Sequence, residues 1–315
     1  MVLSRTVELT VPPDAPKVRL DVWIVSATGL SRTLLCRDDT VITVNGELAK
    51  RSSVARAGSF VRISYTQEVF EDIEPEDIAL DVIYEDSDIL VINKPQGMVV
   101  HPAAGNHSGT LVNALAARYG REFVESMSPD EEEDFTRPGI VHRLDKDTSG
   151  VMVVALNPKS HSALASQFAA HTVSKTYIAI CRGQFMPRSG TVSTNIARDG
   201  RDRKRFCAVQ SGGRSALTEY NVIEQYARHA YCSVSILTGR THQIRVHMSS
   251  IGHPVLGDAV YARRDPEFPD ATLMLHARRL EIDHPSTGER MTFSSPVPER
   301  FTSVLRRLES AEGRA

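Results

Sequence analysis

Short β-branched runs separated by loops, with few helices among them, make up the sequence from residue 80 onward. Five runs have the composition of strands, namely 89–92, 151–154, 177–180, 217–222 and 232–237. Three stretches have helical periodicity, namely 110–119, 160–170 and 243–251. The helices are too few, and the strands too unevenly spaced, for a barrel of repeated β-α units. This pattern predicts the α+β class, with a mixed, largely antiparallel sheet and a central cleft.

Composition is that of a globular protein. The chain has 315 residues, of which 41% are hydrophobic and 24% charged, enough for a sizeable core. No stretch approaches the roughly 20 apolar residues of a membrane-spanning helix, and the N-terminus lacks the apolar core of a signal peptide. The four cysteines are far apart and form no C-x-x-C pair. We therefore expect a cytoplasmic protein without a disulfide framework or a zinc ribbon.

The net charge of −2 conceals a segregation of charge along the chain. Residues 17–65 contain eight basic and four acidic side chains, whereas residues 66–86 contain nine acidic side chains and no basic one. Nucleic-acid binding depends on the local basic patch, so the near-neutral total does not exclude it. A mixed charged face can equally be an ordinary solvated surface. The acidic stretch with Pro75 inside it predicts a linker over 66–79.

Residues 17–65 are predicted to form a small α/β domain. Apolar residues at helical spacing from Leu20 to Ala27 predict a first helix, and Ser31 can cap a second, short one. Asn45-Gly46 predicts a type I′ turn between two strands. This order resembles the S4-like RNA-binding domain, on the residues Arg19-Leu-Asp-Val-Trp23, Leu30-Ser-Arg32, Val44-Asn-Gly46, Lys50, Ser52 and Gly58.

The S4-like resemblance implies that this domain presents basic side chains to folded RNA. The residues expected to contact RNA are Arg19, Arg32, Lys50 and Arg51. The alternative is a generic unit of helices and a hairpin whose arginines are merely exposed.

Segment 138–150, Pro-Gly-Ile-Val-His-Arg-Leu-Asp-Lys-Asp-Thr-Ser-Gly, has the most distinctive chemistry in the sequence. Apolar residues lead into a polar turn, and Gly150 begins the next strand. Such a turn can project Asp145 into a cleft, where a neighbouring guanidinium such as that of Arg143 favours the ionised carboxylate. From the residues alone a second interpretation remains open, in which these side chains only hydrogen-bond the amides of the turn.

Five segments, in order, resemble the RluA family of pseudouridine synthases. The signature is His142-Arg-Leu-Asp145 followed by Thr148-Ser-Gly150. The other matching segments are Asn93-Lys-Pro95 with Gly97 and His101-Pro102, Lys175-Thr-Tyr-Ile-Ala179, Thr238 to His247 with Gly252-His-Pro254 and Gly257-Asp258, and Leu273-Met-Leu-His-Ala277. The resemblance covers about residues 80–308, which we expect to be the catalytic domain. It most resembles the RluD-type branch, which acts on large-subunit ribosomal RNA.

This resemblance assigns roles to the matching residues. Asp145 aligns with the catalytic aspartate, which bonds to C1′ of the ribose or C6 of the base. Tyr177 aligns with the tyrosine that stacks on the uracil, and Arg245 with the arginine that pairs with the aspartate. Arg143 aligns with the arginine that fills the space left by the flipped base. The other expected substrate-binding residues are His142, Arg240 and Leu275.

These residue types suit the isomerisation of uridine that the resemblance implies. Uracil leaves the ribose through N1, turns and reattaches through C5, so the reaction requires no redox cofactor or metal. A carboxylate can act as a covalent catalyst. An aromatic face holds the freed base without fixing its orientation, at about 1–3 kcal/mol of stacking. The nucleotide must first leave its stack, at a cost of a few kcal/mol. The expected partner is structured ribosomal RNA, free or in an assembling large subunit, and the protein is expected to be a monomer.

Two rival functions use the same residues. Asp145-Lys-Asp147-Thr148 fits the D-x-D-x-T loop of haloacid-dehalogenase-like phosphatases, with Gly257-Asp258 as an acidic magnesium motif. That loop should follow a continuous apolar strand, which His142 and Arg143 interrupt. A catalytically silent RNA-binding protein would lack the set of Asp, Tyr and Arg.

The histidines and Tyr177 also have ordinary structural interpretations. A tyrosine within a strand is more often a core residue than a catalytic one. His242 and His247 are five residues apart, which does not match the i, i+4 spacing of a helical zinc pair. We therefore expect no metal site.

Overall fold

A computed structural model describes residues 2–28, 30, 32–37, 39–54, 56–68, 73–102, 106–127, 137–200, 202 and 205–313. The chain divides into two compact units, Met1–Asp72 and Ile73–Ala315, each with its own hydrophobic core. Within the described ranges, no helix is both long enough and apolar enough to traverse a bilayer.

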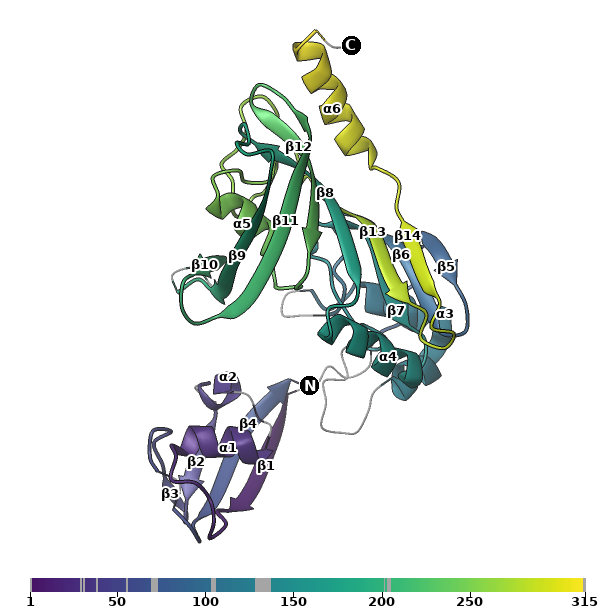
Figure 1. Ribbon diagram of the computed structural model, residues 1–315. Coiled ribbons are helices and arrows are strands. Elements are labelled where there is room, and N and C mark those ends of the chain that lie inside the picture. Colours follow the sequence, from purple (N-terminus) through teal and green to yellow (C-terminus); the bar gives the residue numbers. More distant parts are fainter. Residues whose placement is uncertain are drawn as a thin grey trace. The chain divides into compact units, whose positions relative to one another are not determined.

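The first unit packs two helices on a small antiparallel sheet (Figure 1). Along the sheet the strands run in the order β1-β4-β2-β3. The elements are β1 (Val2–Thr10), α1 (Leu20–Thr28), α2 (Arg32–Leu35), β2 (Val41–Val44), β3 (Glu47–Leu48) and β4 (Phe60–Glu68). Helix α1 buries Leu20, Trp23 and Ile24, as its apolar spacing predicts.

The first unit has its predicted turn but is longer than predicted. The predicted turn between β2 and β3 is present, and both Asn45 (φ 52°) and Gly46 (φ 88°) have the positive φ that a type I′ turn requires. Strand β1 pairs with β4 over its whole length, so the unit includes a strand that the predicted boundary at residue 17 leaves out. Strand β4 continues to Glu68, which shortens the predicted linker at its start. Ser31 lies outside the described residues.

The second unit is built on a ten-stranded mixed sheet, with strand order β10-β9-β11-β12-β8-β13-β7-β6-β5 and β14 beside β13. The strands are β5 (Val82–Glu85), β6 (Ile89–Lys94), β7 (Ser149–Ala155), β8 (Ser174–Arg182), β9 (Ser189–Arg198), β10 (Phe206–Val209), β11 (Arg214–Gln225), β12 (His229–Ile236), β13 (Leu275–Asp283) and β14 (Arg290–Ser294). The helices are α3 (Leu111–Ser126), α4 (Pro158–Ala169), α5 (Gln243–Ser250) and α6 (Glu299–Ala311). The predicted α+β class with a largely antiparallel sheet is confirmed, because among these strands only β13 and β7 pair in parallel.

The helices lie on different parts of this sheet. Helix α4 contacts β7 and β13, whereas α5 contacts β9, β10 and β11. Figure 1 shows β9, β11 and α5 on one side of β8, and β13, β7 and β6 on its other side. Residues that precede β7 and residues that begin α5 therefore approach each other across β8, although about 100 positions separate them, from Asp145 to Arg245.

Gly150 places the polar turn beside the centre of the sheet. Its φ is 118°, and a Cβ atom there would overlap the carbonyl oxygen of Ala277 on β13. Only glycine allows the two backbones to approach this closely at that φ. The turn at residues 142–148 therefore enters β7 directly beside β13.

Candidate active site

A cavity of about 620 Å³ lies where the turn before β7 meets β8, the start of α5 and the start of β13. All seven site residues predicted in the second unit line it: Asp145, Tyr177, Arg245, Arg143, His142, Arg240 and Leu275. They come from four separate stretches of sequence, so the fold brings together what the sequence keeps apart.

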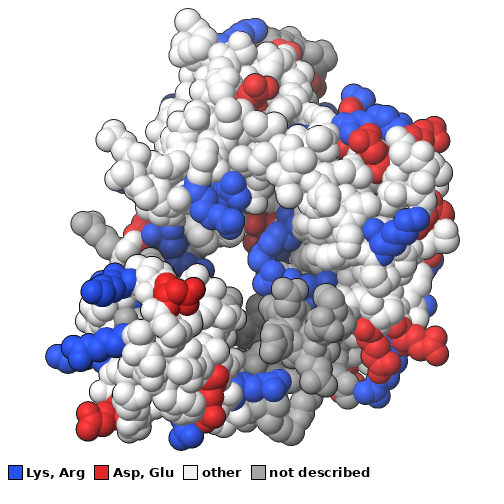
Figure 2. All heavy atoms as spheres, turned by 60° about the horizontal axis from the view of Figure 1, so that its bottom comes forward, with Lys and Arg blue, Asp and Glu red and all other residues white. Residues whose placement is uncertain are grey.

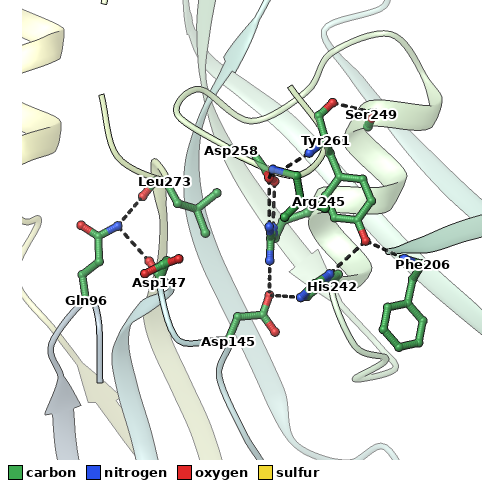
Figure 3. A network of polar contacts seen from close by, with 11 residues as sticks. Gln96, Asp145, Asp147, Phe206, His242, Arg245, Ser249, Asp258, Tyr261 and Leu273 are labelled. Atoms are coloured by element: carbon green, nitrogen blue, oxygen red, sulfur yellow. Dashed lines mark hydrogen bonds and ion pairs between the residues drawn. The ribbon is translucent and has the colours of Figure 1, made fainter. Parts of the chain in front are cut away.

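Asp145 and Arg245 form the expected contact inside this cavity. Arg245 Nη1 donates to Asp145 Oδ2 at 3.1 Å. The same guanidinium donates from Nε (2.7 Å) and Nη2 (2.9 Å) to the two oxygens of Asp258 (Figure 3). Two carboxylates thus share one arginine, whose pKa is raised by Asp258 and Asp145 against the opposing effect of burial. The arginine is fixed by Asp258 and presents its remaining edge to Asp145.

Asp258 is held on both of its sides. Its Oδ1 also accepts from the amides of Val260 (2.9 Å) and Tyr261 (3.1 Å). Arg245 and these amides keep the pKa of this buried carboxyl below its usual value, although burial alone would raise it. Gly257-Asp258 belongs to a segment that resembles the family, but the resemblance assigns Asp258 no role. The structure shows that Asp258 holds the guanidinium of Arg245 in place.

The turn that carries Asp145 is anchored through its backbone. The fully buried ammonium of Lys94 donates to the carbonyl oxygens of Pro95 (2.9 Å), Met98 (2.8 Å) and Lys146 (3.1 Å). Burial lowers the pKa of Lys94 to about 8, while the nearby Asp145 and Asp147 act in the opposite direction. Among the described residues, the Asp145 carboxylate accepts no hydrogen bond from an amide of its own turn. The interpretation of Asp145 as a mere turn-capping residue therefore does not fit.

Tyr177 is both a core residue and a cavity residue. It lies in β8, opposite Val234 of β12 and Ala277 of β13, and its side chain is buried in the core cluster. Burial, and secondarily the charge of Asp145, raise its pKa well above the ordinary value. At neutral pH the ring is therefore a neutral phenol, suited to stacking and hydrogen bonding. Leu275, also buried, lines the cavity as an apolar wall.

His142 lines the cavity but is already engaged within the protein. Its Nε2 accepts from the backbone amide of Val153 at 3.0 Å. The imidazole stacks on Phe168, with ring centroids 4.7 Å apart and 18° between the planes. Burial, and secondarily Lys175, lower its pKa to about 3. These contacts suit a residue that orients the turn, whereas the sequence predicted a substrate contact.

Several basic side chains line the cavity. Arg143 is exposed, and Arg240 is half-buried with its Nε donating to Ser215 O at 2.9 Å. Lys175 and Arg214 also line the cavity. Burial, and secondarily Arg240, lower the pKa of Lys175 to about 8. Neither Lys175 nor Arg214 was assigned a role from the sequence, although Lys175 lies two residues before Tyr177 on the same strand.

In the first unit, three of the four residues expected to contact RNA are exposed: Arg19, Lys50 and Arg51. Arg19 is paired with Asp21 at 2.9 Å, and Arg51 Nη1 donates to Leu35 O at 2.7 Å. The side chain of Arg32 lies outside the described part of the chain. On the face shown in Figure 2, Lys and Arg side chains form several separate groups with acidic side chains among them.

The phosphatase alternative does not fit the cavity. Asp147 is exposed and is absent from the cavity lining, so the two aspartates of the D-x-D-x-T pattern do not converge (Figure 3). The carboxylate of Asp258 forms an ion pair with Arg245.

One cluster elsewhere has the composition of a metal site. Potential ligand atoms of Asp86, Asp88 and His284 lie within 4.8 Å of one another. Asp86 accepts from His284 Nε2 at 2.9 Å, and Asp88 accepts from Asn157 (2.9 Å) and Ser160 (2.7 Å). These ligand atoms already have protein partners, so the cluster is explained as a hydrogen-bonded link between loops.

Comparisons with known proteins show which family this chain is similar to. A family model described as RNA pseudouridylate synthase matches residues 88–250. The ribosomal large subunit pseudouridine synthase D of Pseudomonas aeruginosa is 42% identical over 93% of this chain and 88% of its own length. An uncharacterized RNA pseudouridine synthase of Aquifex aeolicus is 41% identical over 98% of this chain and 99% of its own. Among solved structures, human RNA pseudouridylate synthase domain containing 4 has a TM-score of 0.57 at 25% identity, over 73% of this chain and 93% of that one.

Proposed function

The chain belongs to the RNA pseudouridylate synthase family, and on that premise we propose that it isomerises specific uridines in large-subunit ribosomal RNA. The predictions of an RluA-family synthase of RluD type and of a pseudouridine synthase fold are confirmed. Relatives that are 38–42% identical bear the name of a large-subunit synthase, which supports the choice of substrate.

The observation that carries this proposal is the convergence of Asp145, Arg245 and Tyr177 on one cavity. A carboxylate, a fixed cation and an aromatic face are the groups that an isomerisation of uridine needs. The cavity also has an apolar wall, Leu275, against which a flipped base can lie. The phosphatase and silent-binder alternatives do not explain this arrangement.

In the proposed reaction Asp145 acts as the nucleophile. If it attacks C1′, a carboxylate oxygen bonds to that carbon while the N1–C1′ bond breaks and its electron pair passes to the uracil. The uracil turns, C5 attacks C1′, and the carboxylate leaves with its electron pair. C5 then loses its proton and N1 gains one, so the product is an isomer of the uridine. Attack at C6 of the base is the alternative route and needs the same ionised oxygen in the cavity.

Arg245 holds the Asp145 carboxylate in place through a direct ion pair. Its guanidinium has bidentate hydrogen bonds to Asp258, so it is fixed before the substrate arrives. A preorganised cation of this kind loses little further freedom when charge changes on the carboxylate. Tyr177 stacks on the uracil as a neutral phenol and lets the detached base rotate.

The basic residues that line the cavity are proposed to hold the RNA. Arg143 is exposed within the turn, and it is proposed to fill the gap that the uridine leaves in the base stack. Arg240 is proposed to contact a neighbouring phosphate. We propose an S4-like domain that comprises residues 17–65 together with β1 and the end of β4, then a linker that ends at residue 79, and a catalytic domain over 80–308. The first of these would dock on folded RNA through Arg19, Arg32, Lys50 and Arg51.

We further propose that the enzyme works in the cytoplasm as a monomer, on ribosomal RNA that is free or part of an assembling large subunit.

Pseudouridine mapping of total RNA from cells that lack this gene tests the proposed function. We expect specific positions in large-subunit RNA to lose pseudouridine and to regain it when the gene is restored. An unchanged map of ribosomal RNA would contradict the proposal.

A further inference from the structure

His242 lines the cavity immediately before α5, with backbone angles φ 56° and ψ 19°. Residues other than glycine adopt this left-handed conformation uncommonly, and such strain concentrates at functional sites. Its imidazole lies between Asp145 on one side and Tyr261 on the other (Figure 3). From the sequence, His242 was considered as a metal ligand and excluded. Tyr261 was assigned no role.

The hydrogen bonds of Tyr261 bear on which nitrogen of His242 carries the proton. The Tyr261 hydroxyl oxygen accepts from the Phe206 amide at 2.8 Å and lies 2.9 Å from His242 Nδ1. Because the amide can only donate, the hydroxyl proton is free to point to Nδ1. Burial lowers the pKa of His242, and the flanking Asp145, Asp258, Arg245 and Arg143 have opposing effects. If the hydroxyl donates to Nδ1, the one proton of the neutral ring is on Nε2.

This Nε2–H faces the carboxylate of Asp145. Nε2 is 3.9 Å from Asp145 Oδ2, which is the oxygen that also accepts from Arg245 Nη1 at 3.1 Å. The longer distance exceeds a hydrogen bond, and catalytic contacts of this kind often shorten when the substrate binds. Among the described residues, no hydrogen bond reaches Oδ1.

We infer that His242, with its tautomer set by Tyr261, is a positioning residue that holds Oδ2 of Asp145 together with Arg245 and leaves Oδ1 to react with the uridine. This inference rests on the proposed function. It names two residues that act through Asp145 and assigns different tasks to its two oxygens.

Two substitutions of His242 separate the Nε2–H donor from the rest of the side chain. His242→Asn tolerates the left-handed backbone and can still accept from Tyr261, but its amide is too short to reach Asp145. His242→Gln places an amide N–H near the position of Nε2. The full-length enzyme is assayed in single turnover on a large-subunit RNA transcript containing 5-tritiated uridine, because pseudouridine formation releases the hydrogen on C5.

We expect His242→Asn to lower the single-turnover rate on the order of 10²-fold, the typical cost of misplacing a reacting group by about 1 Å. We expect His242→Gln to recover at least half of that loss on a logarithmic scale, with the Kd for RNA and the Tm unchanged in both variants. A wild-type rate for His242→Asn, or equal losses in the two variants, would overturn the inference.

Tyr261→Phe provides a second test, because it removes the hydroxyl that fixes the tautomer and leaves His242 in place. We expect its rate to fall by about 10-fold, in keeping with the loss of a single hydrogen bond of about 1.4 kcal/mol. An unchanged rate would show that the tautomer is not set by Tyr261. If the wild-type enzyme itself released no tritium from large-subunit RNA, the proposed function would fail instead.

Discussion

Arg245 and Asp258 form a bidentate ion pair whose side chains are only 9% and 0% exposed. Removing one partner of a buried pair leaves the other charge uncompensated, typically at a cost of about 3–5 kcal/mol. Asp258→Asn is therefore expected to lower the free energy of unfolding by about 3 kcal/mol, since Arg245 keeps Asp145 as a partner. Urea denaturation measures this change.

The matched control for this pair is Asp270→Asn, which removes the exposed partner of Arg264. Surface pairs contribute about 0–1 kcal/mol. Equal destabilisation by the two substitutions would mean that the Arg245–Asp258 pair does not support the fold as described.

The buried Lys94 provides a test of how the catalytic turn is held. Lys94→Met keeps the apolar stem but leaves three carbonyl oxygens without their donor, at about 1–3 kcal/mol for each one that stays unpaired. We expect a lower Tm and a lower rate of tritium release. Lys146→Met, at an exposed position of the same turn, is expected to leave the Tm within about 2 °C of the wild type. A Tm for Lys94→Met equal to that of Lys146→Met would rule out the anchoring role.

His247 links stability to pH. It is fully buried between Thr194 and Thr218, and burial lowers its pKa to about 4. Between about pH 6.5 and 4 the unfolded chain binds a proton at this histidine and the folded chain does not, so stability falls as pH falls through that window. His247→Gln removes this contribution. Denaturation at pH 7 and pH 5 should show a smaller loss of stability in the variant, and identical losses would refute this account.

The exposed Lys50 tests the proposed RNA-docking role of the first unit. Lys50→Ala should weaken binding to folded RNA and reduce the slope of log K against log salt concentration by about 0.7–0.9, as expected for one lost phosphate contact. Arg62→Ala is the control, because Arg62 on β4 is paired with Glu8. Equal slopes for wild type and Lys50→Ala would remove this lysine from the RNA interface.

Local patterns in the sequence predicted the local structure of this chain well. The β-branched runs became β6, β7, β8, β11 and β12, and the three helical stretches became α3, α4 and α5. Strand β13 was missed because Arg278, Arg279 and Glu281 interrupt its apolar pattern. It is nevertheless central, since it pairs with β8, with β7 and with β14.

The site was predicted in part, and the missing part has a physical reason. Asp145, Tyr177 and Arg245 lie in recognisable motifs, so their approach to one another could be anticipated. The contacts of Asp258 with Arg245, and of Tyr261 with His242, depend on the loop after α5 folding back against the start of that helix. Neither spacing nor periodicity encodes that return, because it follows from the packing of the whole sheet.

The central claim is that Asp145 is the nucleophile, and two aspartates of the same turn test it most directly. Asp145 faces the cavity, whereas Asp147 is exposed outside it. Tritium release from a 5-tritiated large-subunit RNA transcript should vanish in Asp145→Ala and persist in Asp147→Ala, with RNA affinity retained by both. Release by Asp145→Ala at the wild-type rate would contradict the account.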